Sequence, residues 1–286
     1  MYRKYICPII IDYREKDSIE ILPNVNLSKM SEEDKMTYFN IMEDEYGMNN
    51  IYVTTNDPIQ PNINDYGFRL ACNHKLIMPK AIFKQVLITL MLYKTSNFGI
   101  KYIRGNEYKD FDIIPNCLYI PSLTIIKADI PKIRKIYSIV ALYLKDKFFI
   151  KVMDSYKRIL SFSELTPDEK YRDLVVILEK LYLQGEDRNI KKKLSSRIAE
   201  YFHIFYAKNY DDVYTFVRQA YSIRSNIAHD GESNLDFENS DNSQFLKLLN
   251  ITRLSILLYL EHIYAFDSKI LKQLPIKDNH ISSSQS

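Results

Sequence analysis

One short segment of the sequence combines residue types that can act on a phosphate group. Arg224 and His229 lie five positions apart, and Gly231 follows them closely. A guanidinium is permanently charged and grips phosphate oxygens through two parallel hydrogen bonds. An imidazole exchanges a proton near neutral pH, so it can serve as a general acid or base. The segment therefore predicts a site that holds a phosphate and moves a proton.

The spacing within this segment limits how the two side chains can meet. Five residues of α-helix turn about 500°, which leaves Arg224 and His229 about 140° apart around the helix axis. Two arrangements remain open: the helix ends before His229, or a second copy of the chain completes the site. A structural alternative needs no site, because a helix-terminal Arg and a C-cap His both stabilise the helix dipole.

The composition argues against several other kinds of site. The chain has 286 residues but only 6 glycines, and it contains no glycine-rich nucleotide-binding loop. Cys7, Cys72 and Cys117 lie far apart, without metal-binding spacing to one another or to a histidine. We therefore expect no cofactor, no metal ion, no disulfide framework and a cytoplasmic location. No apolar run approaches the length of about 18 residues that a membrane span requires.

The N-terminal part of the chain, residues 1–127, mixes strand and helix patterns. Its β-branched and aromatic runs are bounded by Asn, Asp, Pro or Gly, which is typical of strands. Two helices are expected among them, one after the N-cap residue Ser31 and one that begins at Pro79. We interpret this part as an α+β domain of unknown role. The expected strands are residues 5–13, 18–22, 51–55, 67–72, 99–104 and 117–126.

From residue 128 the apolar period changes to 3.6, which predicts an all-α domain over residues 128–275. Thr166 and Glu169 form a capping box, with Pro167 at the first helical position. The tail, residues 276–286, is rich in serine and is predicted to be disordered. The fold class is thus α+β, a mixed N-terminal region followed by a helical bundle. Further helices are expected to begin near residues 130, 148, 190, 212 and 245.

The excess of basic side chains lies in the helical part. Residues 1–127 carry 15 basic and 15 acidic side chains, whereas residues 128–286 carry 24 and 21. The formal net charge of +3 therefore belongs to the helices. Lys191, Lys192, Lys193 and Arg197 crowd one stretch there. Such a stretch is either a solvated helix face or a track that guides an RNA backbone.

Three motifs in the helical part resemble the HEPN superfamily, specifically the Apea-like HEPN domain. They are the LE-x-L helix around Glu179, the K-[LI]-x-x-R helix over residues 193–199 and the R-x(4)-H segment over residues 224–229. The motifs occur in the family's order, and the resemblance covers residues 130–265, about half of the chain. Two positions depart from the pattern: Ser225 stands where Asn is common, and Asp230 separates the histidine from the glycine.

The resemblance implies a metal-independent endoribonuclease that works as a homodimer with a composite active site. In such a site the RNA 2′-OH attacks the adjacent phosphate, leaving a cyclic phosphate and a free 5′-OH. His229 is then the general acid or base, Arg224 stabilises charge on the phosphate oxygens and Asn226 positions the reacting groups. Ser225 and Asp230 are assigned supporting roles beside them.

A buried carboxylate is costly without a partner, so Glu179 is expected to pair with a basic residue such as Arg197. By analogy with the family, the protein is expected to be a prokaryotic defence effector, anti-phage or toxin-like, with RNA as substrate and a cognate regulator or antitoxin as partner. The alternative is a HEPN module without catalysis, which binds RNA or a nucleotide or serves as a scaffold.

Overall fold

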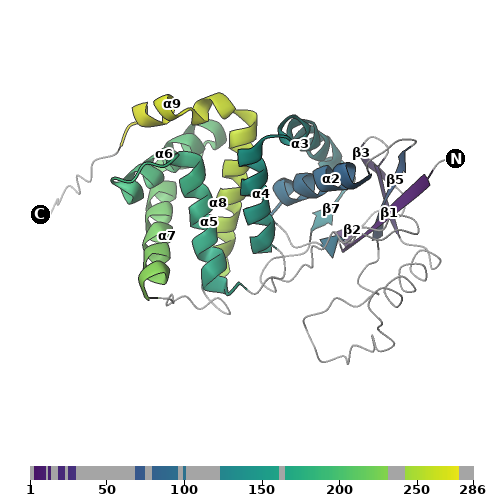
Figure 1. Cartoon of the computed structure of the whole chain (residues 1–286), viewed down its shortest axis with the longest axis horizontal. Helices are drawn as coiled ribbons and strands as arrows, with labels where there is room; N and C mark the ends of the chain where they lie inside the picture. Colours follow the sequence, from purple (N-terminus) through teal and green to yellow (C-terminus); the bar gives the residue numbers. More distant parts are fainter. Residues whose placement is uncertain are drawn as a thin grey trace, which may run out of the picture. The chain divides into compact units, whose positions relative to one another are not determined.

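The structure is a computed structural model that describes residues 3–10, 12–13, 19–22, 25–29, 68–74, 79–95, 99–100, 123–160, 165–230 and 242–276. These residues are mostly helical (Figure 1). The chain divides into two compact units, Met1–Ser163 and Glu164–Ser286. All the strands described lie in the first unit, and the described part of the second unit is a bundle of helices.

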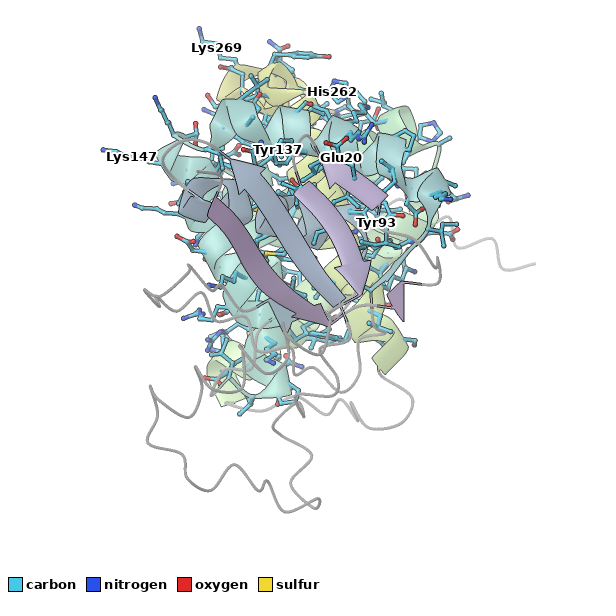
Figure 2. The ribbon with its side chains drawn as sticks, turned by 90° about the vertical axis from the view of Figure 1, so that its right-hand side faces the viewer. Glu20, Tyr93, Tyr137, Lys147, His262 and Lys269 are labelled. Atoms are coloured by element: carbon cyan, nitrogen blue, oxygen red, sulfur yellow. The ribbon has the colours of Figure 1, made fainter. Side chains whose placement is uncertain are left out.

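The first unit contains an antiparallel sheet of five strands in the order β3-β4-β5-β1-β6 (Figure 2). A second, short pairing joins β2 and β7 in parallel. β4 was not predicted, although only two residues, Pro23 and Asn24, separate it from β3, which is a hairpin spacing. The strands are β1 (Arg3–Ile10), β2 (Asp12–Tyr13), β3 (Ile19–Leu22), β4 (Val25–Lys29), β5 (Phe68–His74), β6 (Gly99–Ile100) and β7 (Thr124–Ile125).

Four helical segments complete the described part of this unit: α2 (Pro79–Tyr93), η2 (Lys127–Asp129), α3 (Ile130–Tyr143) and α4 (Lys147–Leu160). α3 packs on α2, where the Gln85 side chain donates a hydrogen bond to the Tyr137 carbonyl. It also contacts β3, because Arg134 donates to the carbonyls of Glu20 and Ile21. Figure 2 labels Glu20 and Tyr137.

The boundary between the two units lies later in the chain than the sequence predicts. The boundary was expected after residue 127, where the helical period begins, but α3 and α4 belong to the first unit. Helical periodicity identifies an amphipathic helix without showing which core its apolar face joins. Several expectations lie outside the described residues: the strand at 51–55, the helix after Ser31, most of the strands at 99–104 and 117–126, and the tail 277–286.

The second unit begins with α5 (Pro167–Tyr182), which packs against α6 (Ile190–Tyr206), α7 (Tyr210–Asp230) and α8 (Asn242–Glu261). In Figure 1, α5, α7 and α8 run side by side. The chain continues through η3 (Ile263–Phe266) and α9 (Ser268–Gln273). The core is formed by fully buried apolar side chains of α5, α6 and α8, among them Leu174, Ile177, Leu178, Leu194, Ile198, Leu248 and Leu258.

α6 and α7 form an antiparallel helical hairpin joined by a short connection. Ala207, at the end of α6, has φ 50°, a left-handed conformation that turns the chain out of the helix. At the end of α5, Gln184 and Gly185 are also left-handed, with φ 48° and 88°. The sequence predicts that Gly185 ends this helix, but α5 ends earlier, at Tyr182, and Gln184 is the first left-handed residue after it. Among the described ranges, no helix is both long enough and apolar enough to cross a membrane.

The N-terminus of α5 has the capping box that the sequence predicts. The Thr166 hydroxyl accepts a hydrogen bond from the Glu169 amide at 3.2 Å, and the Glu169 carboxylate accepts one from the Thr166 amide at 2.8 Å. Thr166→Ala leaves an amide of the first turn without its partner, so we expect it to lower the free energy of unfolding by about 1 kcal/mol. Urea denaturation followed by circular dichroism measures the change. Thr166→Ser keeps the hydroxyl and should match wild type; equal losses in both variants would contradict a capping role.

Candidate functional site

The helix α7 runs without a break through both residues of the R-x(4)-H segment. It ends at Asp230, one residue beyond His229. One of the two arrangements left open by the sequence, a helix that ends before His229, is therefore wrong. In a continuous helix the two side chains leave the axis about 140° apart. From this geometry we expect that Arg224 and His229 of a single chain do not converge on one phosphate.

The end of α7 presents the motif on two different faces. Asn226 and His229 are exposed, Ser225 is half-buried, and their spacings of three and four residues put them on one side of the helix. Arg224 turns toward α5, where its Nη2 lies 3.4 Å from a carboxylate oxygen of Glu179. Asp230 is the last residue of α7.

Arg224 is held by an acidic side chain and an aromatic ring. Its guanidinium carbon lies 5.8 Å from the centre of the Tyr221 ring, within cation–π range. Burial raises the pKa of the Glu179 carboxyl, and the nearby Arg224 charge offsets only part of this rise. Burial also raises the pKa of Tyr221, and the Glu179 charge adds to the effect. This cluster of Glu179, Tyr221 and Arg224 is called the arginine cluster below.

Glu179 pairs with a basic side chain, as expected, but this base is Arg224 and not Arg197. Arg197 binds Glu186 instead. Arg197 is only 1% exposed; its Nη1 donates to the Tyr182 carbonyl and its Nη2 lies 2.8 Å from Glu186, both contacts within the bundle. The structure therefore gives Arg197 a role in packing, in place of the expected contact with RNA.

The lysines of the expected RNA track lie in the first turn of α6 and differ in their surroundings. Lys193 binds the same carboxylate as Arg197, that of Glu186. Burial favours a raised pKa for Glu186, but the hydrogen bonds from Lys193 and Arg197 outweigh burial and lower it. Lys191 and Lys192 are half-buried. Their contact with RNA stays a prediction.

Two residues that contribute to this region were not predicted from the sequence. Tyr221 lies three residues before Arg224, on the same face of α7, so the spacing of an aromatic and a basic residue was the available signal. Glu186 follows the left-handed residues Gln184 and Gly185, which end α5 and precede α6. No local pattern distinguishes this acid from its exposed neighbours, because its partners come from the next helix.

No group of three or more His, Cys, Asp or Glu side chains in the described part of the chain is arranged to hold a metal ion. No protein-family model, curated protein or solved structure matches the chain. The R-x(4)-H segment and the continuous helix α7 are the features of the described chain that point to a function.

Proposed function

We propose that the protein is a HEPN-type endoribonuclease that acts as a homodimer and cuts RNA without a metal ion. One observation carries this proposal: α7 is continuous from Arg224 to His229, so the two side chains of one chain point apart. A second copy, related by two-fold symmetry, can place its His229 opposite the first copy's Arg224. Each dimer then has two equivalent composite sites.

The chemistry follows from what the two side chains can do. In one copy, His229 acts as the general base and takes the proton of the RNA 2′-OH as its oxygen attacks the adjacent phosphorus. The bond to the 5′-oxygen breaks, this oxygen takes a proton from water, and the products are a 2′,3′-cyclic phosphate and a 5′-OH end. Arg224 of the other copy neutralises charge on the non-bridging oxygens. The exposure of His229 and Asn226 leaves both within reach of RNA.

A specific observation favours a second candidate function. Arg224 already has an anionic partner in Glu179, at 3.4 Å, and an arginine held in this way is suited to a structural role. On this reading the protein is a HEPN module without catalysis, which binds RNA or a nucleotide or serves as a scaffold. A salt-dependent gel shift with uncut RNA is its expected signature.

The biological setting is part of the same proposal. The HEPN resemblance supports a cytoplasmic defence effector, anti-phage or toxin-like, whose activity is controlled by a cognate regulator or antitoxin. Lys191 and Lys192, at the start of α6, are proposed to attract the RNA backbone, because both residues are partly exposed and positively charged.

Incubation of the purified protein with mixed tRNA in EDTA tests the proposed reaction. Wild type is expected to give fragments with cyclic phosphate and 5′-OH ends. His229→Ala and Arg224→Ala should each lower the cleavage rate by about 100-fold or more, because each removes a group that acts in the transition state. His203→Ala is a matched control, since His203 is an exposed histidine of α6. Equal cleavage by wild type and both motif variants would overturn the assignment.

A further inference from the structure

The arginine cluster joins two helices at the point where the proposed reaction needs a fixed cation. Glu179 comes from α5, whereas Tyr221 and Arg224 come from successive turns of α7. The side chains of Arg224 and Glu179 are 27% and 19% exposed, so both are largely withdrawn from water. A half-buried guanidinium is stabilised by a counter-charge, and Glu179 supplies it.

The contact with Glu179 orients Arg224 and leaves most of its hydrogen-bond donors for other partners. A guanidinium has five N–H donors, and Glu179 engages one nitrogen through one oxygen. The separation of 3.4 Å is longer than the 2.7–2.9 Å of a strong charge-assisted hydrogen bond. The Nε of Arg224 is buried and has no hydrogen-bond partner among the described residues. The buried Nε is closed to a phosphate, so we expect a phosphate to bind the Nη donors that Glu179 leaves unused.

The Tyr221 ring restricts the guanidinium in another direction. Since the guanidinium carbon lies 5.8 Å from the ring centre, the ring covers one side of the cation. Glu179 of α5 and Tyr221 of α7 thus both oppose rotation of the Arg224 side chain into solvent.

We propose that Glu179 and Tyr221 are positioning residues for RNA cleavage, which hold the Arg224 guanidinium ready for a phosphate. This inference rests on the proposed function and deepens it, because it assigns roles to two side chains that touch neither the phosphate nor the 2′-OH. Arg224 acts on charge that develops during the reaction, so its misplacement lowers kcat more than it changes KM.

The kinetic test is Glu179→Gln, which keeps the shape of the side chain and removes its charge. We expect kcat to fall about 10- to 100-fold, with KM changed little. Glu179→Asp keeps the charge and should recover part of the loss. Glu179→Gln combined with Arg224→Ala should be no slower than Arg224→Ala alone, because the two residues act as one unit. Glu200→Gln, on α6, is the matched control for loss of an acid in this unit.

A second measurement reports on Arg224 without any cleavage. In protein labelled with ¹⁵N-arginine, the Nε–H signal of Arg224 is identified by its loss in Arg224→Lys. Glu179→Gln and Tyr221→Leu should each shift or broaden this signal, whereas Tyr221→Phe keeps the ring and should leave it in place. Circular dichroism and the unfolding midpoint check that each variant is folded.

The outcomes separate the two proposals. A slow Glu179→Gln variant with a changed Arg224 signal supports positioning. Wild-type kcat together with an unchanged Arg224 signal in Glu179→Gln overturns it. If wild type cuts no RNA but the Arg224 signal still responds to Glu179→Gln, the ribonuclease proposal fails, and with it the role in cleavage, while the orientation of Arg224 by Glu179 stands.

Discussion

A mixture of Arg224→Ala and His229→Ala chains is expected to cut RNA at about a quarter of the wild-type rate, although neither variant alone has appreciable activity. Random pairing makes half of the dimers mixed. In each mixed dimer, one composite site carries both substitutions and the other carries neither. The recovery follows from the unbroken α7, which directs Arg224 and His229 of one chain to different sides.

The experiment requires that the mixed dimer be isolated. The two variants are co-expressed with different affinity tags, the doubly tagged species is purified, and its cleavage rate is compared with that of wild type. This species should show about half of the wild-type rate, because one of its two sites is intact. A chain with both substitutions, paired with either single variant, is the control and should recover nothing. Lack of recovery in the isolated mixed dimer would mean that each chain builds its own site.

Arg197→Ala is expected to lower the free energy of unfolding by about 3–5 kcal/mol. Arg197 is 1% exposed and joins two parts of the second unit through Glu186 and the Tyr182 carbonyl. Its removal leaves Glu186 with Lys193 as its cationic partner among the described residues and opens a space in the bundle. Arg197→Met fills more of this space and should cost less.

Guanidinium chloride denaturation at several pH values measures this contribution. The folded pKa of Glu186 lies below its unfolded value, so the stability it provides is present above the unfolded pKa and is lost as the pH falls through the folded pKa. The difference between wild type and Arg197→Ala should therefore shrink in acid. Arg188→Ala, at an exposed position before α6, is the control and should lie within about 0.5 kcal/mol of wild type. A similar small effect of Arg197→Ala would contradict the structural role given to this residue.

The helices were predictable where their signals are local. The start of α2 at Pro79 and of α5 at Pro167, after the cap residue Thr166, follows from capping and proline preferences within one turn. The helix expected to begin near residue 245 begins at Asn242 and ends at Glu261, where η3 and α9 follow. Helix ends without a strong stop signal are set by tertiary packing, which the sequence pattern does not reveal.

The site was predictable in part for the same reason. The R-x(4)-H segment is a local pattern on one helix, and its helical geometry follows from spacing alone. The exchange of partners between Arg197 and Arg224 was not predictable, because it depends on how α5 meets α6 and α7. Ridge-into-groove packing sets how these helices meet. A shift of one helix by one turn would give Glu179 and Glu186 different basic partners.

The helical hairpin of α6 and α7 has a consequence for how the protein folds. The two helices are neighbours in sequence, and the left-handed Ala207 reverses the chain between them. Contacts at short sequence separation close with little loss of chain entropy, so this hairpin is expected to form early. The contact between Glu179 and Arg224 spans 45 residues and follows later. Arg224 thus gains its helix before it gains its counter-ion, and the cation is fixed in place only when the bundle is nearly complete.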